Sequence, residues 1–262
     1  MPSLVRNRLY LGDICDAAEI LQNGSPEITH ILSIFSTTSI SYFSEWHSEV
    51  SIVSKEIRKV VSGEKILHLV EYAGKDLKFV RMAASLEDVA SENLLDCLEV
   101  CLNFIDESRK HGSVLVHCFA GQSRSAAVMT AYLMRTEQLS LEDALTSLRL
   151  SRETVCPNDG FLYQLKSFEN MGFKIDLASP LYKRFRMRLL GDSYDRGEII
   201  DFMKFAVDPG LPAKAISSKR VASSKGEDKP DSAYCCKKCR RVVAVLDTVV
   251  QHTPGEKEIV IK

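Results

Sequence analysis

Residues 112–135 contain the pattern of a buried strand, a short loop and a helix in direct succession, and this part of the sequence constrains the fold most. Residues 114–116 (Val-Leu-Val) form an apolar β-branched run that is entered through a glycine, which is typical of a central strand. Residues 125–135 are rich in Ala, Met and Leu, which favour a helix. Residues 117–124 between them, His-Cys-Phe-Ala-Gly-Gln-Ser-Arg, contain the spacing Cys-x5-Arg. A loop that leaves a buried strand and opens a helix indicates an α/β fold.

Strand-like and helix-like stretches alternate through the rest of the first 175 residues. The spacing of apolar residues predicts strands at 9–12, 28–34, 66–72 and 79–83 and helices at 14–21, 93–110 and 141–150. Residues 52–61 fit either a strand or a helix. We interpret His30, Cys97 and Cys101, which lie inside these elements, as structural residues. The alternation predicts a mainly parallel central sheet flanked by helices.

The loop at residues 117–124 is suited to hold a phosphate group. Where a loop opens a helix, several backbone N–H groups and the positive end of the helix dipole point at one place. Gly121 permits a backbone turn that a side chain would hinder, and Arg124 offers a planar fork that matches two phosphate oxygens. We expect Cys118 to lie at the floor of this loop. The residues expected around the phosphate are Phe119, Ala120, Gly121, Gln122, Ser123 and Arg124.

Cys118 has the surroundings of a nucleophile. Amides at a helix N-terminus and a neighbouring guanidinium favour the thiolate form of a cysteine, so we expect Cys118 to be ionised at neutral pH. A thiolate can attack phosphorus in line and form a cysteinyl-phosphate, which divides hydrolysis into two steps. Ser125 can donate a hydrogen bond to the departing thiolate in the second step. The spacing of Cys118 and Arg124 is weak evidence by itself, because a chain with eight cysteines can contain it by chance, so the strand, glycine, serines and helix around it are the stronger signal.

A leaving oxygen needs a proton, and residues 85–91 (Ser-Leu-Glu-Asp-Val-Ala-Ser) offer two acids. We predict that Asp88 is the general acid, because it lies between a predicted strand and a predicted helix that starts near Asn93, where a mobile loop can cover the phosphate. Glu87 is the competing acid. In a purely structural interpretation, Asp88 only caps that helix, and the loop holds a core cysteine and a surface arginine.

These residues resemble the protein tyrosine phosphatase superfamily, and Cys-Phe-Ala-Gly-Gln-Ser-Arg-Ser at 118–125 resembles its dual-specificity branch. The resemblance covers about residues 3–175 and includes residues 9–12, 28–32, Asp88 and Pro-Asn-Asp-Gly-Phe at 157–161. It implies a protein tyrosine phosphatase-like fold, hydrolysis of phosphotyrosine and phosphoserine/threonine, phosphorylated proteins as partners, and no metal or cofactor in catalysis. We expect His117 and Asn158 to support the loop, Asn158 on the strength of this resemblance.

The C-terminal part of the chain differs in charge and composition. Residues 182–241 hold 15 Lys/Arg against 8 Asp/Glu, whereas residues 1–181 hold 17 against 24, although the whole chain has a net charge of −1. We predict a catalytic domain at 1–175, a basic and polar linker at 176–232, and a small, poorly structured, partial zinc-ribbon-like segment at 233–262. A solvated linker is favoured over a binding surface for nucleic acid or acidic proteins.

Residues 171–173, 182–186, 205–209 and 236–241 resemble the zinc-binding dual-specificity phosphatases of the type 12 subfamily, whose C-terminal domain binds zinc through Cys and His residues. The candidate ligands here are Cys236, Cys239 and His252, with Cys235 as a candidate fourth. A closed structural site needs four ligands, and two adjacent cysteines rarely serve one tetrahedral site. The sequence therefore leaves the presence of structural zinc open.

Two other functions fit part of the same pattern. A scaffold that holds phosphoproteins without hydrolysing them would use the same loop, but the nucleophile, arginine, serine and acid together favour an enzyme. A phosphatase for phosphoinositides or RNA 5′-phosphates is the second alternative, although the loop lacks the lysines of phosphoinositide-specific relatives.

The absence of a signal-peptide pattern and of a long apolar run, with sparse cysteines, predicts the cytoplasm, the nucleus or both. We expect no membrane or nucleic-acid partner, and the sequence does not predict an oligomeric state.

Overall fold

The computed structural model of the 262-residue chain describes residues 1–46, 48–62, 65–176, 179–195, 233–235 and 242–245. The chain divides into two compact units, Met1–Ile175 and Asp176–Lys262. The strand, loop and helix with the Cys-x5-Arg spacing belong to the first unit.

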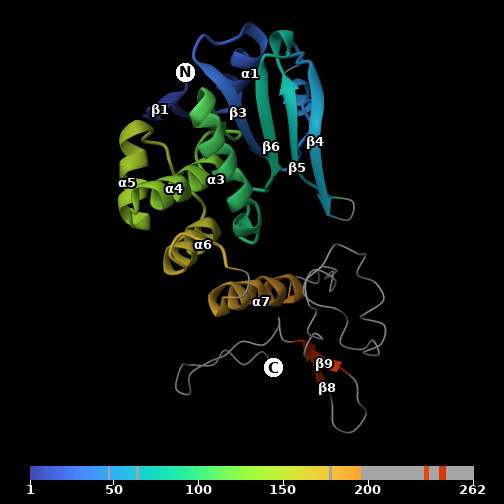
Figure 1. Ribbon diagram of the computed structural model, residues 1–262, viewed down its shortest axis with the longest axis vertical. Coiled ribbons are helices and arrows are strands. Elements are labelled where there is room, and N and C mark those ends of the chain that lie inside the picture. The colour runs from blue at the N-terminus through green and yellow to red at the C-terminus, as the bar shows by residue number, and fades with distance from the viewer. Residues whose placement is uncertain (47, 63–64, 177–178, 196–232, 236–241, 246–262) are drawn as a thin grey trace. The chain divides into compact units, whose positions relative to one another are not determined.

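The first unit is built on a seven-stranded mixed sheet (Figure 1). Its strands are β1 (Ser3–Arg6), β2 (Leu9–Gly12), β3 (Ile28–Phe35), β4 (Ser54–Ser62), β5 (Lys65–Ala73), β6 (Phe79–Ser85) and β7 (Ser113–His117). Their order across the sheet is β1-β2-β7-β3-β6-β5-β4. The central strands β2, β7, β3 and β6 are parallel, and antiparallel strands lie at both edges. The carboxyl ends of the parallel strands meet at one end of the sheet, which is where ligands bind in open α/β sheets.

Helices cover both faces of this sheet. In chain order they are α1 (Ile14–Asn23), α2 (Tyr42–Trp46), the 3-10 helix η1 (Lys75–Leu77), α3 (Leu94–His111), α4 (Arg124–Glu137), α5 (Leu141–Ser151) and α6 (Asp159–Asn170). α3 and α4 pack on one face, α5 and α6 pack against α4, and α1 and α2 cover the other face. The side chains of Asp13, Asn93, Ser140 and Asn158 each accept a backbone N–H in the first turn of a helix, which sets where α1, α3, α5 and α6 begin.

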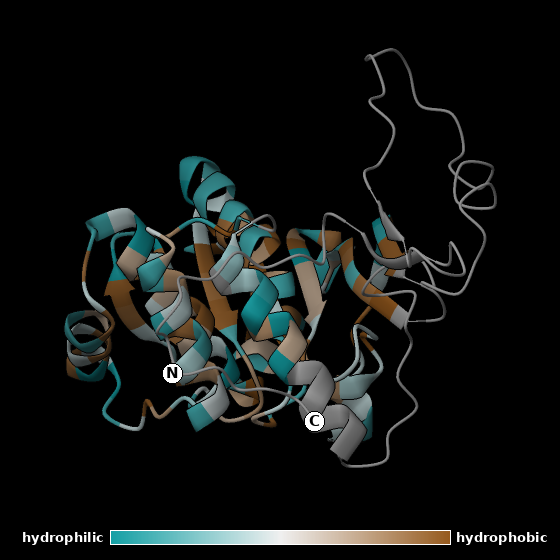
Figure 2. Cartoon of the chain, turned by 90° about the horizontal axis from the view of Figure 1, so that it is seen from below, coloured by the Kyte–Doolittle hydropathy of each residue, from teal (hydrophilic) through white to brown (hydrophobic). Residues whose placement is uncertain are grey.

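The hydrophobic core lies on both sides of the sheet. On the side of α1 and α2, it includes Ile31, Phe35, Phe43 and Leu115. Side chains alternate between the two faces of a strand, so the neighbours of these strand residues face α3 and α4. Figure 2 shows hydrophobic strand residues in the interior and many hydrophilic residues on the surrounding helices. Packing on both faces fixes the register of the central strands, because a shift of one residue would move every side chain to the opposite face of the sheet.

The predicted strands and helices of the first unit all occur, with bounds that differ by a few residues. The parallel centre of the sheet agrees with the predicted fold class, and the antiparallel edge strands make the sheet mixed. Residues 52–61, whose sequence fits either a strand or a helix, belong mainly to β4 (Ser54–Ser62), an edge strand paired with β5.

The second unit contains α7 (Pro180–Asp195) and an antiparallel pair of strands, β8 (Ala233–Cys235) and β9 (Val242–Val245). α7 begins at a proline, which suits the first turn of a helix, and it lies within the stretch predicted as a linker, so part of that stretch is helical. Cys236, Cys239 and His252 lie outside the described residues. Within the described parts of the chain, every helix is too short or too polar to cross a membrane.

Candidate active site

The Cys-x5-Arg loop (residues 117–124), which we call the phosphate-type loop, lies at the carboxyl end of β7, in the middle of the parallel strands. Its neighbours are β2, which ends at Gly12 beside His117, and β3, in which Ser33 pairs with His117 and the strand continues to Phe35. β2 leads directly into α1, and β6 leads into the acid loop, which we define as residues 86–93. The topology therefore brings the phosphate-type loop, the start of α1 and the acid loop to one place.

The backbone carbonyls of the loop are hydrogen-bonded by groups from outside it. The three bonds run from Ile14 N–H to Phe119 O (3.0 Å), from Arg152 Nη2 to Ala120 O (3.2 Å) and from Cys156 N–H to Gln122 O (2.9 Å). No cis peptide bond occurs in the described residues, and in a trans peptide the N–H points away from the carbonyl. The N–H groups of Ala120, Gly121 and Ser123 therefore face the inside of the loop. Inward N–H groups are what an anion site needs.

Gly121 is required by both conformation and space. Its φ of +70° lies in the left-handed region, which favours glycine. A Cβ at this position would lie 2.6 Å from the carbonyl oxygen of Gly12, at the end of β2. The loop can therefore turn against β2 only because residue 121 has no side chain.

Cys118 lies at the floor of the loop and is 1% exposed. Ser125, which is buried in the first turn of α4, donates a hydrogen bond from Oγ to the Cys118 sulfur at 3.1 Å. The residue at the start of α4, Ser123, makes no side-chain capping bond to the helix. The first N–H groups of α4 are thus available to a ligand, and an anion is favoured at this end of the helix.

Arg124 lies at the edge of the loop with its guanidinium group held by an aromatic ring. Its Cζ atom lies 5.9 Å from the centre of the Phe35 ring, and its side chain is 12% exposed. Nε is buried and makes no hydrogen bond, and the distance from Nε to Asp88 Oδ2 is 3.7 Å. The guanidinium therefore has donors left for the oxygens of an anion in the loop.

Asp88 lies against the loop in a small network of hydrogen bonds. Its Oδ1 accepts from Ser123 Oγ (2.6 Å) and from Asn158 Nδ2 (2.9 Å). The backbone N–H of Asn158 donates in turn to Ser123 Oγ at 3.2 Å. Glu87 and Asp88 are both exposed, but these hydrogen bonds involve Asp88, and the cap of α3 is Asn93 rather than Asp88. The structure thus brings Asp88, and not Glu87, to the phosphate-type loop.

The acid loop is fixed at both ends. At its start, Leu86 N–H donates to Phe35 O at 2.6 Å. At its end, the side chain of Gln164 in α6 donates to Glu92 O at 2.8 Å and accepts an N–H from the first residue of α3, also at 2.8 Å. Gln164 is 1% exposed, so these bonds are shielded from water.

α6 also approaches the acid loop backbone to backbone. A Cβ on Gly160 would lie 1.9 Å from the carbonyl oxygen of Ala90. Only glycine permits this approach, since real Cβ atoms are never so close to an oxygen. Because Asn158 at the start of α6 bonds Asp88 directly, α6 positions the acid through both its backbone and its cap residue.

Arg152, the residue that ends α5, connects α1 to the loop and was not predicted from the sequence. Its Nη2 donates to Asp13 Oδ2 at 3.0 Å as well as to Ala120 O, and its side chain is 16% exposed. A single arginine at the end of a helix has no sequence motif, so only the tertiary contact reveals it.

Two aromatic residues meet beside the loop. The rings of Trp46 and Phe119 lie 6.1 Å apart, edge to face, and the two side chains are 38% and 41% exposed. Trp46 is the only tryptophan in the chain. Its fluorescence should therefore report events in the loop, because it contacts the residue that follows Cys118.

His117, directly before the nucleophile candidate, is fully buried. Burial lowers the pKa of His117 to about 3, and the positive charge of Arg81 acts in the same direction. His117 is therefore neutral at physiological pH and does not supply a second positive charge to the loop.

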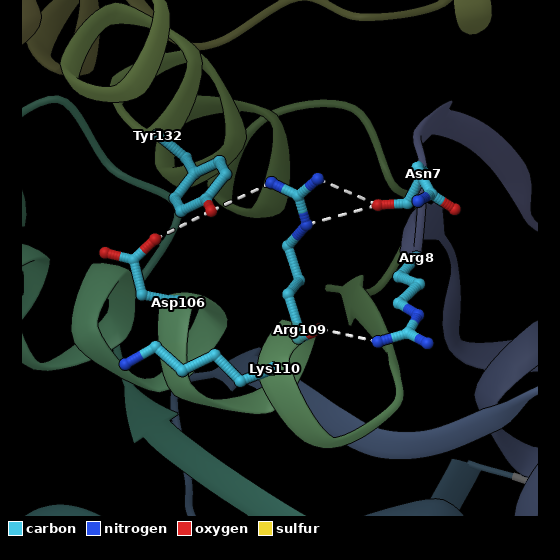
Figure 3. Close-up of a pocket in the computed structure, with 6 residues that line it drawn as sticks. All are labelled: Asn7, Arg8, Asp106, Arg109, Lys110 and Tyr132. Carbon is cyan, nitrogen blue, oxygen red and sulfur yellow. Dashed lines mark hydrogen bonds between the residues drawn. The ribbon is translucent and has the colours of Figure 1, made fainter.

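A polar pocket of about 370 Å³ lies at the other end of the parallel strands (Figure 3). Arg109 crosses it, donating from Nη1 to Tyr132 Oη (3.0 Å) and from Nε and Nη2 to Asn7 O (3.2 and 2.8 Å). Arg8 donates to the backbone oxygen of Arg109. These contacts occur in the last turn of α3, where the helix dipole favours basic side chains and disfavours anions. The pocket is best explained as a structural site, where hydrogen bonds hold α3, α4 and the turn that precedes β2 together.

The described residues offer no metal site. No group of three or more His, Cys, Asp or Glu side chains within them is placed to hold a metal ion. The five cysteines whose surroundings the structure describes, Cys15, Cys97, Cys101, Cys118 and Cys156, are free thiols.

The fold and the loop define a class of protein, and the sequence matches that class. Residues 24–171 match the model of the dual specificity phosphatase catalytic domain, which covers more than half of the chain. The chain belongs to the dual specificity phosphatase family.

Among the proteins that the chain resembles is human dual specificity protein phosphatase 12, with 34% identity over 173 residues, 66% of this chain and 47% of that protein. Tyrosine-protein phosphatase YVH1 of Saccharomyces cerevisiae is 27% identical over 254 residues, 95% of this chain and 65% of that protein. The crystal structure of DUSP15 aligns with a TM-score of 0.49 and 26% identity over 71% of this chain and 96% of that chain. The matched region spans about half the length of the human relative.

Proposed function

We propose that the chain is a protein phosphatase that hydrolyses phosphotyrosine and phosphoserine/threonine through a cysteinyl-phosphate. The observation that carries this proposal is the arrangement around Cys118: a buried sulfur that accepts a hydrogen bond from Ser125, inside a loop whose N–H groups face inward. Family membership supports it, since relatives that match the chain are named as dual specificity and tyrosine-protein phosphatases.

In the first step, the Cys118 thiolate attacks phosphorus, and the bond from phosphorus to the leaving oxygen breaks. Arg124 and the N–H groups of the loop stabilise the charge on the other phosphate oxygens. Asp88 gives its proton to the leaving oxygen, so the product leaves as a phenol or an alcohol. The phosphoryl group remains on the Cys118 sulfur.

In the second step, a water molecule attacks phosphorus and gives a proton to the Asp88 carboxylate. The bond between sulfur and phosphorus breaks, and the Ser125 hydroxyl stabilises the departing thiolate by the hydrogen bond seen at 3.1 Å. The sum of both steps is one phosphate ester and one water converted to one alcohol and one phosphate. No metal or cofactor takes part in this sequence.

Phosphorylated proteins in the cytoplasm or nucleus are the proposed substrates. The free thiols among the described cysteines suit a reducing compartment.

We also propose that the second unit binds structural zinc through Cys236, Cys239 and His252. The strands β8 and β9 support this, because they pair with each other and border the sequence that holds Cys236 and Cys239.

The test is Cys118→Ser in the full chain, with Cys15→Ser, an exposed cysteine, as the matched control. We expect Cys118→Ser to show no turnover of p-nitrophenyl phosphate, phosphotyrosine peptide or phosphothreonine peptide, but still to bind phosphopeptide and change the emission of Trp46. Cys15→Ser should keep wild-type turnover.

Two results would favour the alternatives. A wild-type chain that binds phosphopeptides without turnover is a scaffold. A wild-type chain that turns over phosphoinositides or 5′-phosphorylated RNA in preference to phosphopeptides is a non-protein phosphatase.

A further inference from the structure

Four polar residues form a row across one face of the sheet, next to the phosphate-type loop. Glu71 in β5 is the register partner of Arg81 in β6, and Ser33 in β3 is the register partner of His117 in β7. Arg81 pairs with Ile31, two positions before Ser33, so the Arg81 and Ser33 side chains lie on the same face. The row thus crosses four neighbouring strands and ends at the residue that precedes the nucleophile.

The row is buried in a hydrophobic environment. Arg81, Ser33 and His117 have no exposed surface, and Glu71 is 2% exposed. The Arg81 guanidinium lies 5.6 Å from the centre of the Phe43 ring, which belongs to the hydrophobic cluster under α1 and α2. Burying an ion pair costs roughly several kcal/mol per ion, and apolar replacements are often neutral or stabilising. Stability therefore does not explain why two charges are buried here.

The hydrogen bonds of the row have a definite direction. Arg81 Nη1 donates to Glu71 Oε1, and Arg81 Nε donates to Ser33 Oγ at 2.9 Å. Ser33 Oγ lies 2.7 Å from His117 Nε2. Arg81 occupies one of the two lone pairs of the Ser33 oxygen, and His117 Nε2 is the one acceptor that the hydroxyl proton meets among the described residues. We therefore assign the proton of the hydroxyl to this bond, with Nε2 as the unprotonated nitrogen. The neutral His117 ring carries its proton on Nδ1.

The other ring nitrogen, Nδ1, is buried and makes no hydrogen bond to the described residues. The His117 ring packs against Phe35 and Phe43, with ring centroids 5.2 and 5.9 Å away. The row and these two rings therefore hold His117 in one orientation directly before Cys118.

We infer that Glu71, Arg81 and Ser33 are positioning residues that hold the ring of His117, the residue directly before the nucleophile, in the Nδ1–H tautomer and in one orientation. Glu71 fixes the guanidinium, the guanidinium fixes the direction of the hydroxyl, and the hydroxyl fixes the tautomer. The inference rests on the proposed phosphatase function, because it assigns the row to the same loop.

The tautomer can be measured without turnover, by ¹⁵N NMR of the imidazole nitrogens in the full chain, with the His117 signals identified by their loss in His117→Gln. In the wild-type chain we expect a protonated Nδ1 and an unprotonated Nε2. Glu71→Leu combined with Arg81→Met removes both charges together and leaves neither one buried alone. In this double variant we expect a mixture of tautomers, a fall in kcat of about 10- to 100-fold and a KM within about twofold of wild type.

The matched control is Arg6→Met combined with Glu137→Leu, which removes an Arg–Glu pair with distances of 2.7 and 2.9 Å on another part of the domain. We expect the control to keep the wild-type tautomer and kcat. Ser33→Ala tests the same step if the Glu71/Arg81 variant does not fold. A folded variant of either kind with a single Nδ1–H tautomer and wild-type kcat would overturn the inference. If the wild-type chain itself lacks turnover, the proposed function fails, and the NMR comparison still decides whether the row sets the tautomer.

Discussion

Asp88 and its neighbour Glu87 are both exposed, but it is Asp88 that makes hydrogen bonds to Ser123 and Asn158 beside the loop. We expect Asp88→Asn to slow turnover of phosphotyrosine by about 10²–10⁴-fold, because the leaving phenoxide then departs without a proton. The loss should be much smaller for aryl phosphates whose leaving groups are weakly basic. Values of kcat/KM for a series of aryl phosphates would measure this dependence on the leaving group, because kcat/KM reports the first step and not the hydrolysis of the cysteinyl-phosphate.

Glu87→Gln is the matched control for Asp88→Asn, since it makes the same chemical change one residue away. A larger loss of kcat in Glu87→Gln would transfer the acid role to Glu87. A loss of kcat/KM in Asp88→Asn that is equal for all leaving groups would assign Asp88 to holding the loop instead of donating a proton to the leaving oxygen.

Single residues were predictable from the sequence where a motif carries them. Cys118, Arg124 and Ser125 follow from the loop and its helix, and the structure brings all three together with Asp88 and Asn158. Arg152, Ser33, Arg81 and Glu71 were not predictable, because each acts through a partner that is distant in sequence. A charged residue inside an otherwise apolar strand, as at Arg81, was the one available signal.

At the scale of elements, the spacing of apolar residues predicted the strands that are buried on both faces and the helices that are buried on one face. It failed to separate strand from helix at residues 52–61, because β4 is an edge strand with mostly exposed side chains and its apolar residues do not mark a buried face. α2 was not predicted, as its five residues span little more than one turn. The contact between α6 and the acid loop was also not predicted from the sequence. It depends on the missing side chain of Gly160, and no sequence motif marks that glycine.

That contact gives a prediction for Gly160→Ala. The new Cβ would lie 1.9 Å from Ala90 O, so α6 and the acid loop must move apart. We expect kcat/KM for phosphotyrosine to fall about tenfold or more through displacement of Asp88, with a smaller loss for weakly basic leaving groups. Kinetics with the same series of aryl phosphates would measure both effects.

Gly24→Ala is the control for Gly160→Ala. Gly24 has a φ of +91° and open space around its Cβ position, so alanine there strains the backbone without pushing on another element. It should lower the free energy of unfolding by about 1 kcal/mol and leave the dependence on the leaving group unchanged. A Gly160→Ala chain with wild-type kcat on every substrate would show that the acid loop does not depend on this contact.

At the scale of the whole molecule, all the residues proposed for catalysis belong to the unit Met1–Ile175. This unit has its own hydrophobic core, and the family match at residues 24–171 lies inside it. The candidate zinc ligands belong to the other unit, Asp176–Lys262. Chemistry and metal binding should therefore be separable, because no proposed catalytic step uses a residue of the second unit.

We expect a chain that ends at Ile175 to fold and to keep kcat/KM for p-nitrophenyl phosphate within about threefold of the full chain, since a domain with its own core can fold alone. The full chain should contain zinc by native mass spectrometry, and both the shortened chain and a Cys236→Ser/Cys239→Ser variant should lack it, while Cys15→Ser keeps it. If zinc is absent from the full chain, the proposed zinc site is wrong. If the shortened chain folds but loses activity, the second unit contributes to the active site, and the division between chemistry and metal binding is wrong.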